Sequence, residues 1–261
     1  MKTSPFFLAA LIVSSIAFVV STSYAQPDPT ASTSPSAKDT SVPPPVPVAP
    51  SPPRVPMKLL YKPPAGAGNI PTRVSGGARG TGADTSLLAL VPEHAALTTH
   101  AQPSLFWFQS KPAKAKLELA LVEPKKAKPV LALTSGTANQ IGIHRIKLAN
   151  HKIELQPDVL YEWTVAIVPD AANRSKDVIA KGVIKRVSSP GDLDKKVESV
   201  TDTEKAAIYA EAGIWYDALE AISNAVDAHP EDASLREQRA SLLKQVGLPE
   251  AAAIDRGSKG R

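Results

Sequence analysis

The chain has 261 residues, with 30 Lys and Arg against 25 Asp and Glu, and it has no cysteine. Without cysteine it can form neither disulfide bonds nor thiolate metal sites, so an ordinary hydrophobic core must hold the fold. The charge is uneven, because residues 100–190 carry 14 Lys and Arg against 7 Asp and Glu, whereas residues 191–261 carry 9 against 14. A basic module followed by an acidic one fits docking of the two, and it fits equally two separately solvated surfaces.

The first 25 residues have the pattern of a secretory signal peptide. Lys2 precedes an apolar run over residues 6–20, and small residues occupy positions 23 and 25, which a signal peptidase reads. The alternative is a membrane anchor, which needs about 20 apolar residues. We therefore expect cleavage after Ala25, a periplasmic or secreted protein, and no membrane span after removal of the signal.

The segment 26–64 contains 13 of the 25 prolines in the chain. Proline lacks an amide donor and fixes φ, so this composition is typical of an extended, solvated linker without secondary structure. We expect the Pro-rich segment to be a disordered tether rather than a ligand for a Pro-binding domain.

Short apolar or alternating runs follow, separated by turn residues, at 87–91, 104–108, 116–122, 129–133, 141–148, 160–168 and 178–187. Strands spaced by roughly 10 residues predict a β-sandwich, which we assign to residues 65–190 together with a Gly/Arg loop at its start. Tyr161 opens a strand shortly after Leu155 and Pro157. This pattern is typical of the tyrosine corner of immunoglobulin-like and fibronectin type III sandwiches, although an unrelated tyrosine at a strand start is the alternative.

Residues 191–261 change to a helical period. Capping boxes at Thr201-x-x-Glu204 and Ser234-x-x-Glu237 predict two helix starts, and a helix between them carries Trp215 on its apolar face. Counting 34 residues from Gly213 leads to Gly247, so the segment resembles about one and a half tetratricopeptide units, with about three helices. Such short arrays cannot bury their own apolar face. We expect the tail to pack on the sandwich through Trp215 and Tyr216, and the fold to be α+β.

Two charged clusters are candidates for binding. Arg73 and Arg79 flank a glycine-rich loop that could cradle a phosphate or carboxylate, or could pair with surface acids along the sandwich. Arg174 and Asp177 lie in a predicted loop between strands, where an ion pair that holds the turn is the default interpretation and partner binding the alternative.

Residue patterns of established chemistry are missing. The five histidines lack metal-ligand spacing, no Gly-x-Ser-x-Gly elbow occurs, and the acids form no recognisable catalytic pair. We therefore predict no catalytic, metal-binding or cofactor-binding residue. The run Phe106-Trp107-Phe108 predicts a core strand with Trp107 and its neighbours on opposite sides, and a sugar-stacking platform is the alternative.

Six motifs occur in order along the chain: Tyr61-Lys-Pro-Pro64, Pro71-x-Arg73-x-Ser-Gly-Gly-Ala-Arg79-Gly80, Leu90-Val-Pro92, Pro103-x-Leu-Phe106-Trp-Phe108, Asn173-Arg-Ser175-x-Asp177-Val and Gly213-Ile-Trp-Tyr-Asp-Ala-Leu219. Together they resemble a family of exported bacterial proteins known as domain of unknown function 928. The chain departs from that pattern at Ala78, where a Thr is expected, and in lacking cysteines. The resemblance implies export and this architecture, and it implies no activity.

These features predict an exported, non-enzymatic protein of a Gram-negative envelope. The first hypothesis is an adaptor or scaffold that binds another envelope protein, because a tether is joined to two folds that usually make contacts. The alternative is a binding module for anionic envelope glycan, based on the basic middle segment and the arginines at 73 and 79. An unrecognised hydrolase is the third, and nucleic acid is not expected as a partner.

Overall fold

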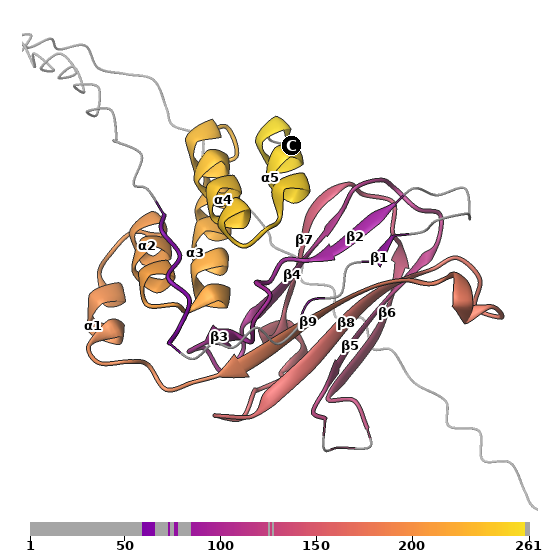
Figure 1. The fold of residues 1–261 in the computed structure, drawn as a ribbon, viewed down its shortest axis with the longest axis horizontal. Coiled ribbons are helices and arrows are strands. Elements are labelled where there is room, and N and C mark those ends of the chain that lie inside the picture. Colours follow the sequence, from indigo (N-terminus) through magenta and orange to yellow (C-terminus); the bar gives the residue numbers. More distant parts are fainter. Residues whose placement is uncertain are drawn as a thin grey trace, which may run out of the picture. The chain divides into compact units, whose positions relative to one another are not determined.

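A computed structural model describes residues 59–65, 73, 76–77, 85–124, 126 and 128–258. The predicted signal peptide with its cleavage site after Ala25, most of the Pro-rich segment, and Arg79 lie outside the described residues. The described part contains two β-sheets and five α-helices (Figure 1). This arrangement confirms the α+β class.

The two sheets have four and five strands. The first has the order β1 (Gly76–Gly77), β2 (Ser86–Ala89), β4 (Ser104–Gln109) and β7 (Gly142–Lys147). The second has the order β3 (Ala96–Thr98), β9 (Val178–Arg186), β8 (Leu160–Val168), β5 (Lys116–Val122) and β6 (Leu131–Thr137). Neighbouring strands are antiparallel, except that β3 runs parallel to β9.

Each of the seven predicted strand segments overlaps an observed strand, and β5 and β8 have the predicted ends. The sequence did not predict β1 and β3, which are two and three residues long. A run of this length shows no alternation, so only pairing with a neighbouring strand defines it.

Alternation along the strands builds the core of the second sheet. Trp163 and Val165 on β8 lie opposite Leu121 and Leu119 on β5, and all four side chains are buried. On the other side of Trp163, its register partner on β9 is Gly182. A Cβ atom at Gly182 would lie 2.7 Å from the indole ring, so the absence of a side chain there lets the ring of Trp163 lie against β9.

The helices follow the strands in the chain. They are α1 (Leu193–Glu198), α2 (Asp202–Glu211), α3 (Trp215–Ala228), α4 (Ala233–Gln245) and α5 (Pro249–Gly257). Two were not predicted, because α1 and α5 are short, with six and nine residues, and offer few turns in which to recognise a helical period. The short 3₁₀ helices Leu148–His151 and Arg174–Lys176 lie in loops between strands.

The helix ends agree with the sequence at one capping box and differ at the other. Thr201 and Glu204 form the predicted reciprocal box at the start of α2. The box predicted at Ser234 is wrong: Asp232 caps α4, and its carboxylate accepts the backbone N–H of Ser234 at 2.8 Å. Both residues are good N-caps, and a shift of two residues between such neighbours cannot be resolved from propensity alone.

The end of the Pro-rich segment packs against the helices, so the predicted linker stops before residue 64. Leu59 and Tyr61 are buried, and the side chain of Gln245 on α4 bonds to the backbone of both at 2.9 Å. The N–H of Lys62 donates at 3.0 Å to the carbonyl of Ala210 near the end of α2, which also accepts the N–H of Gly213 at 3.2 Å. Prolines do not prevent this docking, because the residues between them supply the donors.

Candidate functional site

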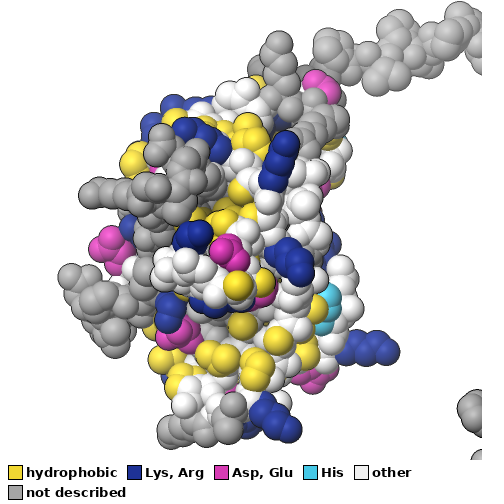
Figure 2. Space-filling view, turned by 90° about the vertical axis from the view of Figure 1, so that its right-hand side faces the viewer, with side chains coloured by type: hydrophobic (Ala, Val, Ile, Leu, Met, Phe, Trp, Pro, Cys, Tyr) yellow, Lys and Arg dark blue, Asp and Glu magenta, His cyan; other side chains and the backbone are white. Residues whose placement is uncertain are grey.

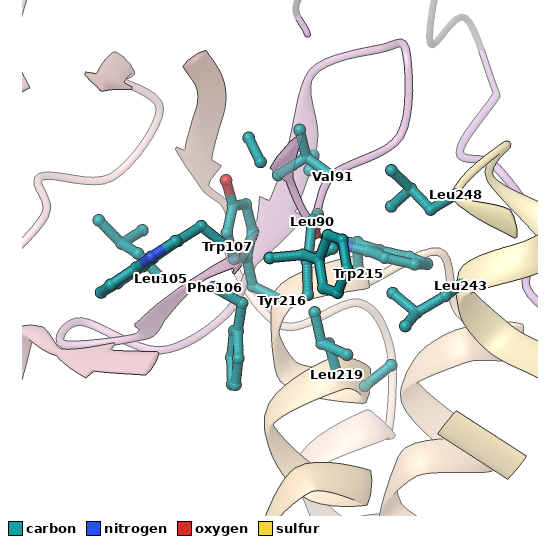
Figure 3. Packing of buried hydrophobic residues seen from close by; sticks show 14 of the residues in the cluster. Leu90, Val91, Leu105, Phe106, Trp107, Trp215, Tyr216, Leu219, Leu243 and Leu248 are labelled. Carbon is teal, nitrogen blue, oxygen red and sulfur yellow. Dashed lines mark hydrogen bonds between the residues drawn. The ribbon is translucent and has the colours of Figure 1, made fainter. Parts of the chain in front are cut away.

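Trp215 and Tyr216 join the helices to the sheets. Both side chains are fully buried. The indole N–H of Trp215 donates to the carbonyl of Leu90 at 2.8 Å (Figure 3). The Tyr216 hydroxyl accepts the indole N–H of Trp163 at 2.8 Å and donates to the carbonyl of Val183 at 3.1 Å. We call this set the junction, and it leaves neither predicted packing residue exposed to a partner.

Arg73 is placed by its own chain rather than by an external anion. Its guanidinium donates to the carbonyl of Val91 at 3.1 Å, to that of Val246 at 2.9 Å, and to the carboxylate of Glu93 at 3.0 Å. Only a tenth of its side chain is exposed. The hypothesis that Arg73 binds an anion is therefore wrong: a cation at the carboxyl end of α4 is stabilised by unpaired helix carbonyls, which sequence spacing does not reveal.

Arg174 and Asp177 form the predicted ion pair. The Nε atom of Arg174 lies 2.7 Å from Asp177, and its two terminal nitrogens bind both oxygens of Glu118 at 3.1 and 2.7 Å. This bidentate contact ties the loop between β8 and β9 to β5, and half of the Arg174 side chain remains exposed.

A polar cluster that the sequence did not predict lies on the other side of the junction. Asp217 on α3 is buried and accepts bonds from the Thr98 hydroxyl and from the N–H and hydroxyl of Thr99. One turn further, Glu220 accepts the hydroxyl of Ser104 at 2.6 Å. The ring of His100 lies 3.8 and 3.7 Å from these two carboxylates.

The environment shifts the pKa values of the cluster in different directions. Contact with Glu220 raises the pKa of His100, against the effect of partial burial. Burial raises the pKa of Asp217, although His100 and the threonine donors oppose it. Burial also acts to raise the pKa of Glu220, but His100 and Ser104 together keep it below its ordinary value. Burial raises the pKa of Tyr209, whose hydroxyl lies 3.5 Å from His100, to about 12.

The bonds of Thr98 and Thr99 to Asp217 tie the end of β3 to the start of α3. We call this set, together with His100, Ser104 and Glu220, the polar latch. The hydroxyl of Ser104 donates to the carboxylate of Glu220 rather than to the His100 ring, so this cluster does not contain a serine–histidine pair. The sequence feature that could have predicted this cluster is the pair of acids at 217 and 220 in an apolar helix, because an acid on a buried helix face needs hydrogen-bond donors. Their donors lie more than 100 residues away in the chain, beyond the reach of local patterns.

A hollow opens between the edges of the two sheets. We call it the edge cleft: it lies between β5–β6 of one sheet and β4–β7 of the other, with a volume of about 530 Å³. Its apolar floor comprises Trp107, Leu117, Leu119, Leu133 and Ile146, and its rim includes Thr134, Thr137, Asn139, Gln140, His144 and His151. An apolar floor with a few polar groups at the rim is the usual composition of a ligand site.

Trp107 forms a wall of the edge cleft. As predicted, it and its neighbours point to opposite sides of β4: in Figure 3 its ring points away from Trp215, and Phe106 lies under the guanidinium of Arg145. The Trp107 ring stacks on His144 with centroids 5.4 Å apart. It is 93% buried, and its indole N–H has no acceptor among the described residues. The ring of Trp107 thus lines the edge cleft, whereas its Nε1 atom is itself buried.

The described part of the chain holds no group of three or more His, Asp or Glu side chains placed to bind a metal ion. It also holds no helix with the length and apolar character that crossing a bilayer requires.

The structure is of the α+β class, with two β-sheets followed in the chain by five described α-helices. Comparison with known families identifies its family. The model of DUF928, a Domain of Unknown Function, matches residues 74–255, and the chain belongs to this family. The match covers sheets and helices together. No curated protein matches the chain. A multi-domain immunophilin from Arabidopsis thaliana is 8% identical over 77% of this chain and 97% of its own, with a TM-score of 0.15, too low to support any argument.

Proposed function

We infer that the two sheets form a divergent immunoglobulin- or fibronectin-like sandwich. The order β9-β8-β5-β6 corresponds to the G-F-C-C′ order of such domains. The predicted tyrosine corner supports this, because the Tyr161 hydroxyl at the start of β8 accepts the N–H of Gln156 at 3.1 Å. The helices resemble two tetratricopeptide-like pairs, since Gly213 and Gly247 end the first helix of each pair with φ near +75°.

We propose that the protein is an exported, non-enzymatic binding protein of the bacterial envelope whose ligand is an anionic glycan. The observation that carries this proposal is the edge cleft beside the most basic part of the chain, where residues 111–152 contain nine Lys and Arg against two acids. Figure 2 shows Lys and Arg side chains spread among hydrophobic ones on one face. A surface potential of this sign attracts polyanions.

The adaptor hypothesis becomes the second candidate. It counted Trp215 and Tyr216 as residues for packing or interaction, and both are fully buried. A different feature now favours it: β6 is an end strand of its sheet, so one row of its backbone groups faces away from β5. Such an edge can accept an extended segment of another protein.

Retention of the purified mature protein by envelope fragments tests this function. Binding to an anionic glycan survives protease treatment of the fragments and weakens steeply with salt, because exposed charges are screened beyond roughly 10 Å at 0.1 M ionic strength. Loss of retention after protease treatment supports the adaptor instead. No retention by treated or untreated fragments overturns both.

The predicted export has its own test. Expression of the full chain in a Gram-negative host, followed by osmotic release and N-terminal sequencing, should give a periplasmic product that begins at Gln26. An uncleaved product in the cytosol would contradict the signal peptide.

A further inference from the structure

Another pocket lies between the start of β7 and the helices, with a volume of about 390 Å³. It adjoins the edge cleft, because Gln140 and His144 line both. Helices α3, α4 and α5 each contribute charged side chains to its wall, which are Asp227, Arg236, Arg239 and Asp255. We call this hollow the arginine pocket.

The two arginines of α4 are equally buried but differ in their partners. Arg236 is 9% exposed and Arg239 is 8% exposed. Arg239 binds both oxygens of Asp255, at 2.9 and 2.6 Å. Arg236 donates to the carbonyl of Pro230 and has no carboxylate partner in the described part of the chain. A buried guanidinium is normally paired, because removing its charge from water is costly, so Arg236 lacks an anion that a ligand can supply.

One nitrogen of Arg236 is open to the arginine pocket. The Nη1 atom donates to Pro230, and the Nε atom is enclosed by the protein without an acceptor. The Nη2 atom makes no hydrogen bond to any described residue either, but it is not one of the enclosed atoms. Because the Arg236 side chain lines the pocket, Nη2 is the donor that an oxygen entering the pocket can reach.

The charges around the arginine pocket favour a single negative charge on the ligand. Arg145 on β7 donates to Asp227 at 2.7 Å, and Arg239 holds Asp255, so each aspartate has its own arginine. Arg236 leaves this set with one positive charge. A carboxylate neutralises that charge, whereas a phosphate dianion would bring an excess of negative charge beside two aspartates.

We propose that the arginine pocket binds one carboxylate group of a ligand through the Nη2 atom of Arg236. Gln140 and Ile141 line the same pocket, and both side chains are exposed. The amide of Gln140 donates to or accepts from polar substituents of the ligand, and Ile141 offers apolar surface to its carbon skeleton. This inference goes beyond the proposed function, because the carboxylate can belong to a uronate of a glycan or to a protein.

Titration of the full mature chain with sodium glucuronate, followed by ¹⁵N NMR, tests the arginine pocket directly. The side-chain Nε–H signal of Arg236, which Arg236→Lys removes and so assigns, should shift with a dissociation constant of about 1–10 mM. Glucose, which lacks the carboxylate, should leave this signal in place. Inorganic phosphate should bind more weakly, and tighter binding of phosphate overturns the carboxylate assignment. If glucuronate does not move the Arg236 signal, or glucose moves it equally, Arg236 only caps the end of α3 and the proposal is wrong.

Two variants with a matched control test the role of Arg236, with binding followed through the backbone amide of Gly142 in the pocket wall. Arg236→Gln removes the guanidinium and should weaken glucuronate binding about tenfold. Arg236→Lys keeps the charge at the end of α3, which protects the fold, and should weaken binding about threefold. Arg256→Gln removes the same charge from an exposed arginine of α5 that pairs with Glu237, and should leave binding unchanged. Equal affinities of the two glutamine variants contradict a site at Arg236.

Retention by envelope fragments identifies the source of the carboxylate and separates this inference from the proposed function. If Arg236→Gln weakens retention that survives protease, the carboxylate belongs to a glycan, and if it weakens retention that protease abolishes, the carboxylate belongs to a protein. If glucuronate fails to shift the Arg236 signal while salt-sensitive, protease-resistant retention persists, this site is wrong and the proposed function stands. If glucuronate binds at Arg236 but no fragments retain the protein, the proposed function fails and the pocket binds a free carboxylate.

Discussion

The junction and the edge cleft both contain buried tryptophans, but they differ in whether the indole N–H has an acceptor. At the junction, Trp163 and Trp215 are fully buried and each indole N–H has an acceptor at 2.8 Å. At the edge cleft, Trp107 is nearly as buried, but its N–H has no acceptor in the described part of the chain. Burial alone therefore does not tell whether the polar atom of a tryptophan has a partner.

This difference assigns separate tasks to the two parts of the domain. The junction closes one side of the sandwich with α3 and with the segment 59–65, and its polar groups are satisfied within the chain. The edge cleft leaves the other side open between β6 and β7. The helices thus act as a structural cap, and binding is expected on the open side.

The largest expected effect comes from Gly213→Ala, which disrupts the junction. Gly213 has φ +77°, and a Cβ atom there would lie 2.8 Å from the carbonyl oxygen of Lys62. Strain in the left-handed region and displacement of the segment 59–65 should together lower the free energy of unfolding by about 3 kcal/mol. Urea denaturation measures this change.

Its matched control is Gly247→Ala, at the equivalent position 34 residues later. Gly247 has φ +74°, but the nearest atom to its Cβ would be Arg73 at 3.6 Å, which is ordinary contact. Only the backbone strain remains, about 1 kcal/mol. Equal losses for the two variants would show that the segment 59–65 does not lie against Gly213.

A second pair of variants compares the tryptophans directly. Trp215→Phe and Trp107→Phe remove similar apolar surface, but only the first leaves a buried carbonyl, that of Leu90, without its donor. Trp215→Phe should therefore lower the free energy of unfolding by about 1–2 kcal/mol more than Trp107→Phe. If the two variants unfold at the same urea concentration, the hydrogen bond of Trp215 to Leu90 does not add to stability, and the two tryptophans do not differ in this respect.

The polar latch beside the junction predicts a smaller, pH-dependent effect. The folded protein raises the pKa of His100, so the protonated ring stabilises the fold below its unfolded pKa near 6.5, and this contribution is lost as pH rises through the folded value. Asp194, Tyr209, Asp217 and Glu220 face this ring.

Urea midpoints of the wild type should consequently fall between pH 6 and pH 8. The fall should be shallower in His100→Gln, in which only the raised pKa of Asp217 acts in the same direction. A wild type and variant with the same slope would show that His100 does not sense the two carboxylates.

The smallest effect is expected on the surface of the sandwich. Arg174 is half exposed, so solvent screens its contact with Glu118, whereas the carboxylate of Asp177 is buried and would lose its partner. In Arg174→Ala the unpaired carboxylate of Asp177 should therefore lower the free energy of unfolding by only about 1 kcal/mol, as measured by urea denaturation. A loss as large as that of Gly213→Ala would mean that the loop between β8 and β9 supports the core.

Local patterns predicted much of the fold. The period-two alternation of β5 and β8 gave their ends, the box at Thr201 gave the start of α2, and Tyr161 makes the bond expected of a tyrosine corner. These features depend on neighbours within a few residues, so the sequence contains them directly. The start of α4 was misplaced because two adjacent residues were equally good caps.

Much less of the candidate sites could be predicted from the sequence. For Arg73 the sequence left open an external anion or a surface acid, and the structure shows bonds to Glu93 and Val246. Asp217 was not predicted, although it accepts three bonds from Thr98 and Thr99. The sequence alone indicated seven of the nine described strands, three of the five described α-helices, and the two glycines, Gly213 and Gly247, that end helices. Tertiary structure decided which polar groups are satisfied inside the chain and which remain for a ligand, because that outcome depends on partners more than 100 residues apart and on where the two sheets leave an edge uncovered.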